Sequence, residues 1–481
     1  MRAGVLALAA TVFTSAGLAD DRANPKMVVN VRAYGAVGDG VADDRPAIQA
    51  ALNDAHKIGH ATVYFGPGVY NLATATSPNG QLSLSDWSKV FSVDLVGDRA
   101  TLSTQQTGGA ILLAEGYWQQ STIQGITFEN RHPITTASTS AIDLEGGGQN
   151  AIRNWSVRNN TFRNFSRHIT VSGVNGLQVT DNQFLMTAGR DSGTAQDMQP
   201  NVAIWLFNNS PNGTSESVEV SENLFDGCTG RDVSATVSHR CADGLVYGQG
   251  SAVLIHDNSI RGFSSEGIYL QPDQTFGAAP VIEDNLVDGT QIKGDVSGGG
   301  QWGIRCDANG ARIIRNTVIN TLTGIMIYGA ELASDVQNET IANNSVITTA
   351  GAAQPFRKGI ELVGASNAIV SGNTVTFASA PTGTGEISLI YVSGLATRYS
   401  NTVTVTNNNV VSSLPSSANS TGIFLQWTSG WQIGGNTIEG SDTGFHVFNL
   451  SGPVALINAL VAQNLMKNDG QNVQITNGLF Q

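Results

Sequence analysis

The sequence predicts an all-β, single-domain, right-handed parallel β-helix of about 11–12 coils with an N-terminal capping helix. One observation is a repeated motif: an aliphatic residue, two polar or small residues, an Asn, one further residue and an apolar residue, most often 27 to 31 residues apart. A repeat of that length is typical of solenoids. A second is that β-branched residues alternate between Gly and Asn turns, which indicates strands rather than paired helices. The repeated asparagines are Asn160, Asn182, Asn223, Asn258, Asn285, Asn316, Asn344, Asn373, Asn408, Asn436 and Asn464.

The repeated Asn also predicts how successive coils hold together. Neighbouring strands lie roughly 4.8 Å apart, so an Asn at the same turn of every coil can hydrogen-bond to the coils above and below. Residues at equal offsets in successive repeats should therefore be neighbours in space.

The segment from Val28 to Leu72 divides into strand, Gly-rich turn, helix, strand and turn. Asp43 or Asp44 can cap the helix, and Pro46 falls in its first turn, where proline is tolerated. A helix here would cover the open edge of the first coil. One face of this helix is apolar, formed by Ile48, Ala51, Leu52 and Ala55.

Three stretches of this segment carry a family resemblance: residues 33–44 (AYGAVGDGVADD), 47–51 (AIQAA) and 63–70 (VYFGPGVY). They resemble the N-terminal signature of the pectate lyase superfamily. That superfamily contains polysaccharide hydrolases, lyases, C5-epimerase-like enzymes and phage tailspikes, so the resemblance implies a β-helix and carbohydrate chemistry. The Asp-Pro-His-Glu, Asn-Thr-Asp and Gly-His-Gly motifs of its individual branches are missing, which leaves the reaction open.

The first 19 residues read as a secretory signal, and the β-helix domain is expected over residues 28–481. Arg2 supplies the positive start, an apolar run follows, and Gly17-Leu18-Ala19 is a small-x-small cleavage site. The run is short for a membrane span. We therefore expect a secreted or periplasmic protein with no membrane span in the mature chain.

The charge argues against nucleic-acid binding, and the cysteines argue against a metal site. The net charge is −13 and only 13% of residues are charged, whereas a nucleic-acid-binding protein normally has a basic surface. Export permits a disulfide between Cys228 and Cys241, which flank one insertion, and Cys306 is expected to point inward. No Cys-x-x-Cys pair exists, so no metal site is predicted.

Strands such as Gly-Ile-Tyr-Leu should place every second side chain outward, which predicts three columns on one surface. The first column is expected to contain Asp143, Thr170, Trp205, Val246, Tyr269, Arg305, Met326 and Glu361. The second is expected to contain Glu145, Ser172, Phe207, Gly248, Gln271, Asp307, Tyr328 and Val363. The third is expected to contain Asp243, Glu266, Trp302, Thr323 and Lys358.

Insertions predict where a site lies along these columns. Residues 186–201, 226–242, 271–280 and 288–301 lengthen the same few coils. Long loops on a rigid solenoid usually build a binding face. The site is therefore expected near the strands that start at Val202, Leu245, Ile268 and Ile304.

Two reactions fit the residues predicted there. A glycoside hydrolase needs two carboxyl groups, one protonated and one charged, and Asp243, Glu266 and Asp307 are the candidates; close like charges would raise one pKa. A lyase or C5-epimerase would instead abstract a proton with Tyr269 or Arg305. No cofactor is required, although a lyase could use Ca²⁺.

Five residues are expected to bind substrate, with Trp205 as a sugar-stacking ring; the others are Gln271, Tyr328, His239 and Arg240. A third interpretation is a non-catalytic glycan-binding protein or adhesin. The unequal coils favour an enzyme. Because acidic candidates outnumber basic ones near the insertions, hydrolysis of a uronic-acid-containing, pectin-like polysaccharide is the favoured function.

Overall fold

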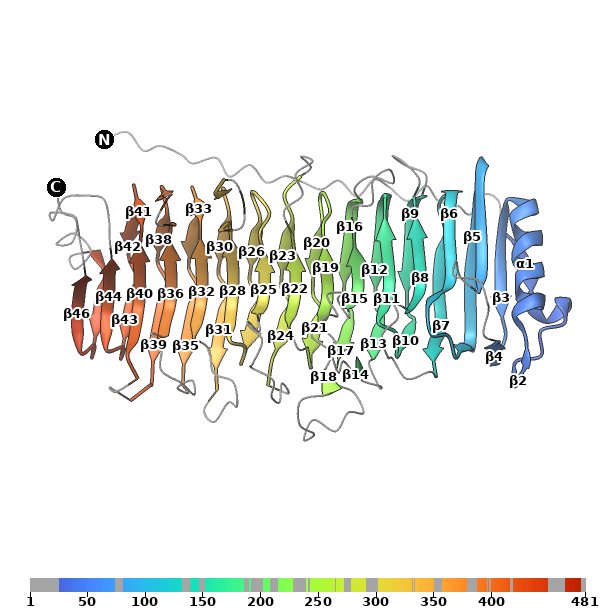
Figure 1. Cartoon of the computed structure of the whole chain (residues 1–481), viewed down its shortest axis with the longest axis horizontal. Coiled ribbons are helices and arrows are strands. Elements are labelled where there is room, and N and C mark those ends of the chain that lie inside the picture. Colours follow the sequence, from blue (N-terminus) through green and yellow to red (C-terminus); the bar gives the residue numbers. More distant parts are fainter. Residues whose placement is uncertain are drawn as a thin grey trace.

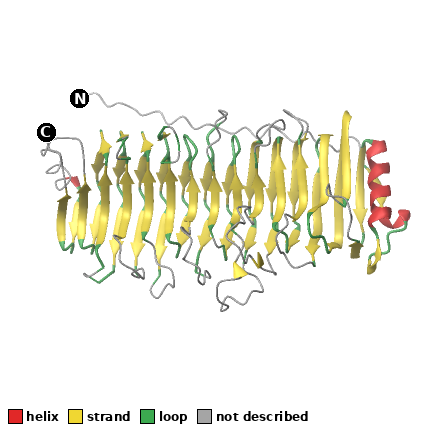
Figure 2. Ribbon diagram, viewed as in Figure 1, coloured by secondary structure: helices red, strands yellow, loops and turns green. Residues whose placement is uncertain are grey.

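The molecule is an elongated stack of coils closed at its N-terminal end by the helix α1 (Figures 1 and 2). The computed structural model describes residues 26–73, 81–131, 139–146, 152–185, 190–191, 202–207, 215–227, 239–240, 243–263, 265–271, 278–290, 302–330, 332, 334–349, 357–378, 387–395, 397, 399–415, 418–448 and 463–476. Forty strands join one hydrogen-bonded sheet. The expected parallel β-helix is therefore confirmed.

Each coil contributes strands to three faces, and within each face the strands pair in parallel. Face 1 contains β5 (Leu82–Thr104), β6 (Gly109–Trp118), β8 (Thr139–Glu145), β11 (Arg167–Ser172), β15 (Val202–Leu206), β19 (Gly244–Gly248), β22 (Glu266–Leu270), β25 (Trp302–Cys306), β28 (Thr323–Tyr328), β32 (Lys358–Val363), β36 (Ile387–Ser393), β40 (Ser420–Gln426), β44 (Thr443–Phe448) and β46 (Gln471–Thr476).

Face 2 follows face 1 along the chain. It contains β1 (Met27–Asn30), β3 (His60–Phe65), the middle of β5, the start of β7 (Thr122–Asn130), β9 (Ile152–Arg158), β12 (Val174–Thr180), β16 (Glu216–Ser221), β20 (Leu254–His256), β23 (Val281–Glu283), β26 (Arg312–Ile314), β30 (Thr340–Ala342), β34 (Ile369–Ser371), β38 (Thr404–Thr406) and β42 (Gln432–Gly434).

Face 3 completes each coil. It contains β2 (Asp39–Asp43), β4 (Gly68–Leu72), the ends of β5 and β7, β10 (Thr161–Arg163), β13 (Gln183–Leu185), β17 (Leu224–Asp226), β21 (Ser259–Arg261), β24 (Leu286–Asp288), β27 (Thr317–Ile319), β31 (Ser345–Thr348), β35 (Thr374–Phe377), β39 (Asn409–Ser412), β43 (Thr437–Glu439) and β45 (Leu465–Lys467).

Three small two-stranded sheets lie outside these faces. They pair β14 (Arg190–Asp191) with β18 (His239–Arg240), β29 (Val336–Gln337) with β33 (Ala365–Ser366), and β37 (Ser400–Asn401) with β41 (Thr428–Ser429).

The helix α1 (Arg45–Ile58) buries the predicted apolar face against β1, β3 and β5. Asp44 occupies the N-cap position, but its carboxylate accepts hydrogen bonds from the backbone N–H groups of Val37 and Gly38 instead of from the helix. The Asp43 carboxylate accepts one from Arg45 N at 3.1 Å. The helix thus protects the first strands from solvent.

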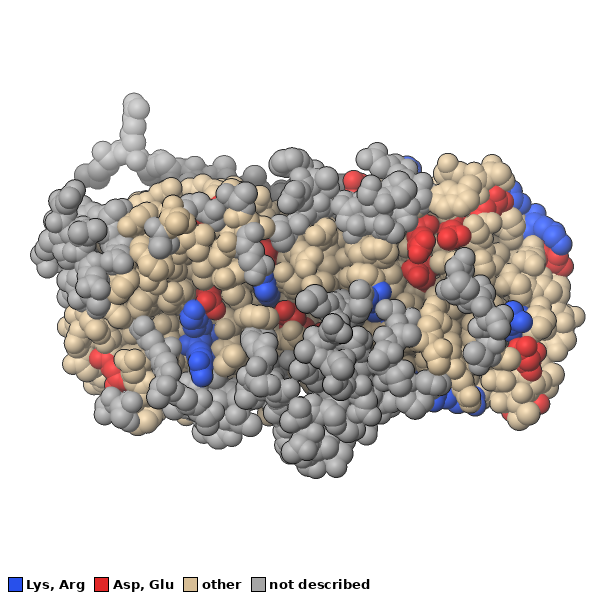
Figure 3. Space-filling view, in the orientation of Figure 1, with Lys and Arg blue, Asp and Glu red and all other residues tan. Residues whose placement is uncertain are grey.

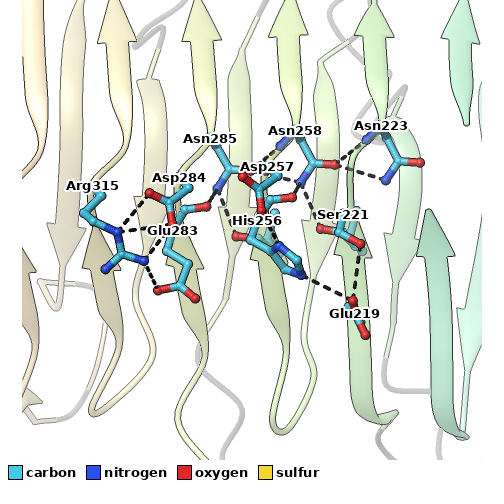
Figure 4. Close-up of polar contacts among 12 residues, drawn as sticks. Glu219, Ser221, Asn223, His256, Asp257, Asn258, Glu283, Asp284, Asn285 and Arg315 are labelled. Atoms are coloured by element: carbon cyan, nitrogen blue, oxygen red, sulfur yellow. Dashed lines mark hydrogen bonds and ion pairs between the residues drawn. The ribbon is translucent and has the colours of Figure 1, made fainter. Parts of the chain in front are cut away.

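The eleven asparagines form a continuous ladder between faces 2 and 3, part of which is drawn in Figure 4. Asn258 is typical: its backbone N and its Nδ2 both donate to Asn285 Oδ1, at 3.1 and 2.9 Å. Its Nδ2 also donates to Val220 O at 2.9 Å, in the preceding coil. Every ladder Asn from Asn160 to Asn436 is at most 2% exposed, so the ladder satisfies polar groups that water does not reach.

The described residues contain more coils than the sequence predicted. Eleven strands of face 1, from β8 to β44, precede a ladder Asn, whereas β5, β6 and β46 do not. The expected number of 11–12 is low because it was counted from the Asn motif, and the terminal coils lack that motif.

Several predictions concern other parts of the chain. Residues 1–19, Cys228 and Cys241 lie outside the described residues, so the signal and the disulfide stay predictions. Cys306 is fully buried and free, as its inward register predicted. In the described part of the chain, no helix has the length and apolar character needed to cross a bilayer.

Candidate functional site

The outward side chains of face 1 form columns as predicted, except at β19. The structure pairs Trp205 with Tyr247 and Tyr247 with Tyr269, whereas Val246 points inward and is fully buried. The prediction was wrong there because it aligned Gly244 of β19 with Gly267 of β22. The true partner of Gly267 is Leu245.

The same shift corrects the other two columns. Gln249 replaces Gly248 in the second column, and its Nε2 donates to Gln271 Oε1 at 3.3 Å. Gly244, not Asp243, lies beside Glu266 in the third column. Asp243 therefore lies one residue before that column, immediately before the start of β19.

The predicted insertions flank face 1 on both sides. Residues 186–201, 226–242 and 288–301 join face 3 to face 1, and residues 271–280 join face 1 to face 2. Most of these residues lie outside the described part of the chain. The strands between them are β15, β19, β22 and β25, so they define the same stretch of face 1 that the sequence indicated.

Arg305 is at the centre of this stretch. Its guanidinium Cζ lies 4.5 Å from the ring centroid of Tyr269, 5.3 Å from that of Trp302 and 5.4 Å from that of Tyr328. These distances are within the range of cation–π attraction. The side chain is 10% exposed, so the charge lies just beneath the surface.

Asp307 neutralises this charge. Its Oδ2 accepts hydrogen bonds from Arg305 Nε at 2.8 Å and from the Tyr269 hydroxyl at 3.4 Å. Its Oδ1 accepts one from Tyr328 N at 2.9 Å. Burial raises the pKa of Asp307, although Arg305 opposes this effect. The carboxylate thus holds the side chains of Arg305 and Tyr269 and the backbone of Tyr328 in place.

Glu266 has a different environment. It is the first residue of β22, the strand next to the one that carries Arg305, and it is 8% exposed. Burial raises its pKa to about 7, with help from the negative charges of Asp243 and Asp307, while Ser265 and Arg305 oppose the shift. A carboxyl group with this pKa is partly protonated at neutral pH and can donate a proton.

Two tyrosines lie beside Arg305 and Glu266. The rings of Tyr247 and Tyr269 meet edge to face with centroids 4.9 Å apart, and Gln271 Nε2 donates to the Tyr247 hydroxyl at 2.9 Å. Burial raises the pKa of both phenols above the usual 10. Both phenols are therefore protonated at neutral pH.

Trp205 adjoins this group, but its ring is covered. Arg167 Cζ lies 3.4 Å from its centroid, and Phe207 stacks on it with centroids 4.6 Å apart. A sugar would have to displace one of these side chains to stack on the indole. His239 and Arg240 form β18, which pairs with β14 outside the solenoid.

A second acidic group on face 1 was not selected from the sequence. It consists of Glu115, Asp143 and Glu145 on β6 and β8, and acidic side chains are visible over these strands in Figure 3. Burial raises the pKa of Asp143 to about 7, with help from Glu145. Asp143 and Glu145 are in the predicted columns, but the sequence does not show that the Asp143 carboxyl group is buried. Within the described residues, no group of three His, Cys, Asp or Glu side chains could hold a metal ion.

The fold and this surface define a parallel β-helix protein with a polar and aromatic face. The chain belongs to the family described as rhamnogalacturonase A/epimerase, pectate lyase-like, whose model matches residues 28–286. This confirms the resemblance to the pectate lyase superfamily. A model described as periplasmic copper-binding protein (NosD) matches residues 348–479.

Curated relatives match only short segments. Mannuronan C5-epimerase AlgE6 of Azotobacter vinelandii is 52% identical over 61 residues, which are 12% of this chain and 7% of the epimerase. Alginate lyase 7 of the same organism is 51% identical over 47 residues, 10% of this chain and 6% of the lyase. The chain thus covers a small part of either relative.

Solved structures agree in fold. The adhesin PfbA of Streptococcus pneumoniae has a TM-score of 0.51 at 16% identity, covering 84% of this chain and 91% of the adhesin. A tailspike protein of E. coli bacteriophage HK620, solved with a pentasaccharide, also has a TM-score of 0.51, at 12% identity and covering 87% and 66% of the two chains. At these identities the likeness shows the β-helix fold alone.

Proposed function

We propose that the protein is a secreted or periplasmic glycoside hydrolase that cleaves a uronic-acid-containing polysaccharide on face 1. Membership of the rhamnogalacturonase A/epimerase, pectate lyase-like family supports action on a polysaccharide. The signal-like residues 1–19 and the NosD match support export.

The observation that carries the proposal is the buried carboxyl group of Glu266, whose pKa is raised. Its pKa of about 7 makes it a general acid that can protonate the leaving oxygen of a glycosidic bond. Asp243, whose charge helps to raise that pKa, is the candidate for the second, ionised carboxyl group. Asp307 is bound to Arg305 and serves as a positioning residue.

The proposed substrate class rests on the donors of Arg305. The guanidinium has five N–H donors, and Asp307 accepts from its Nε and pairs with its Nη2. The remaining N–H donors suit the carboxylate of a uronate. The alternative, a lyase or C5-epimerase, would need Tyr269 or Arg305 in its deprotonated form, and burial raises the pKa of Tyr269.

The test is digestion of polygalacturonate, rhamnogalacturonan and polymannuronate. Hydrolysis yields reducing ends without new ultraviolet absorbance, whereas a lyase also yields absorbing unsaturated ends. We expect Glu266→Gln to lower kcat by at least about a hundred-fold, the usual contribution of a general acid. The control is Glu283→Gln, which changes an outward carboxyl on face 2.

Three results would contradict the proposal. Unsaturated ends would assign a lyase. Full activity in Glu266→Gln would move the reaction away from this carboxyl group. Binding of any of these polymers with neither cleavage nor C5-epimerisation would identify a glycan-binding protein or adhesin.

A further inference from the structure

An exposed aromatic pair lies at the N-terminal end of face 1. Trp87 of β5 is 47% exposed and Tyr117 of β6 is 38% exposed. Their rings meet edge to face, with centroids 6.1 Å apart. Val90, three residues after Trp87, is 60% exposed. Large apolar side chains gathered on the surface in this way usually mark a binding site.

A bulge in β5 holds this pair outward. Asp86 pairs with Gly116 and Phe91 pairs with Trp118, so residues 87–90 stand opposite Tyr117 alone. The extra residues leave the ladder, and β5 extends beyond its neighbours at one long edge of the solenoid (Figure 1). Bulges of this kind commonly redirect side chains.

The bulge is firmly built. Asp86 Oδ1 accepts hydrogen bonds from Ser88 N at 2.7 Å and from Ser88 Oγ at 2.6 Å. His56 Nε2 lies 2.9 Å from Asp86 Oδ2, and Lys89 Nζ donates to His56 O at 3.1 Å. Gly116 has φ +87°, and a Cβ there would lie 2.1 Å from Asp86 O. The aromatic pair is therefore presented by an ordered segment tied to the capping helix.

The size and composition of the patch formed by Trp87, Val90 and Tyr117 indicate what kind of ligand it fits. Stable protein–protein interfaces use roughly 20–30 residues on each side, many more than this patch offers. Exposed Trp and Tyr rings suit a small amphipathic surface with an apolar face and polar edges, which describes a sugar ring. The patch also continues the face that carries Glu266, five strand spacings away, or roughly 24 Å along the solenoid.

We propose that Trp87 and Tyr117 form a remote stacking platform for the sugar rings of a long polysaccharide chain that lies along face 1. This inference rests on the proposed action on polysaccharides. A chain that reaches both the platform and Glu266 gains affinity that a short oligosaccharide does not. The platform therefore selects polymers over fragments.

The experiment is affinity gel electrophoresis of the full protein with long-chain polygalacturonate and polymannuronate. We expect Trp87→Ala and Tyr117→Ala each to weaken binding to the preferred polymer about ten-fold, which corresponds to about 1.4 kcal/mol. Trp87→Phe should retain most of the affinity. Cleavage of the corresponding trisaccharides should not change. The matched control is Tyr399→Ala, which removes a tyrosine of similar exposure, 39%, elsewhere on the solenoid.

Thermal unfolding confirms that each variant is folded. Unchanged retention of Trp87→Ala, or no retention of the wild-type protein by either polymer, would overturn the platform. If Trp87→Ala loses affinity while Glu266→Gln keeps full activity, the platform stands and the catalytic assignment fails. If Glu266→Gln is inactive and Trp87→Ala binds normally, the reverse holds.

Discussion

Glu266 and Asp307 are carboxyl groups on neighbouring coils of the same face, yet their surroundings give them different roles. Asp307 is paired with the Arg305 guanidinium at 2.8 Å and receives two further hydrogen bonds. Burial raises the pKa of both groups, but Arg305 and the hydrogen bonds from Tyr328 N and Tyr269 oppose this shift at Asp307. In the proposed reaction, the two carboxyl groups are therefore a proton donor and a positioning group.

The raised pKa of Glu266 predicts the pH dependence of the proposed reaction. A general acid must be protonated, so kcat/KM should fall as pH rises through about 7. The measurement is the initial rate of reducing-end release across a pH series. A rate that stays constant from about pH 6 to about pH 8 would contradict the assignment.

Replacing Arg305 should destabilise the protein through Asp307. Arg305→Met leaves a carboxylate that is 3% exposed without its cation, and breaking such a pair costs about 3 kcal/mol of unfolding free energy. The double variant Arg305→Met/Asp307→Asn should regain most of that loss. Urea unfolding measures both. Equal stability of the single and double variants would show that the pair is not coupled.

Glu339 is a buried carboxyl group whose pKa makes stability depend on pH. Burial raises its pKa from 4.5 to about 8 in the folded protein. As pH rises above 4.5, the unfolded chain loses this proton while the folded chain keeps it, so the unfolding free energy falls until about pH 8. Glu339→Gln should remove this fall and add roughly 4 kcal/mol at pH 8. Parallel stability–pH curves for the two proteins would refute the prediction.

At the scale of elements, the Asn ladder compensates for short strands. Strands such as β20 and β23 contain three residues each, and a polar turn follows every one. The residue before each ladder Asn from Asn160 to Asn436, for example Asp257 or Asp284, has positive φ. Outside the ladder, charged side chains also bridge coils: Arg315 Nη2 lies 2.6 Å from Asp284 Oδ2 and 2.8 Å from Glu283 Oε2 (Figure 4).

Removing one ladder side chain should be costly. Asn285→Ala leaves Asn258 without the acceptor of two hydrogen bonds and leaves Ile255 O without a donor. We expect a loss of about 3 kcal/mol in urea unfolding, the cost of burying unsatisfied polar groups. The control Glu222→Asn changes an exposed residue with φ +56°, where Asn is well tolerated. A loss under about 1 kcal/mol for Asn285→Ala would show that the ladder contributes little.

For the whole molecule, each coil contacts mainly its two neighbours, so stability should be approximately local. Asn436→Ala should speed amide hydrogen exchange in β44, β45 and β46, because these strands lie beyond the broken rung. Exchange in β9 and β12, near the other end, should not change. Uniformly faster exchange along the solenoid would instead indicate a single cooperative unit.

Much of this architecture could be predicted because its signals are local. The Asn period indicated the coils, the apolar face of residues 45–58 indicated the capping helix, and the insertions indicated the stretch of face 1 between β15 and β25. The prediction was wrong at β19, where Gly244 resembles the first residue of a Gly-Ile-x-Leu strand. In the structure, β19 is shifted by one residue relative to β22, so that Tyr247 pairs with Tyr269. Alternation along a strand cannot reveal such a shift when both Leu245 and Val246 are apolar.

By itself, the sequence determined the solenoid, its ladder and its cap, since period and alternation depend only on residues close in the chain. Only the tertiary structure decided which candidates act together. It brought Tyr247 into the column with Tyr269, joined the Tyr269 hydroxyl to Asp307, and buried Glu266 enough to raise its pKa to about 7. The physical reason is that burial and these cross-coil contacts depend on side chains from different coils, which are separated by 20 or more residues in sequence.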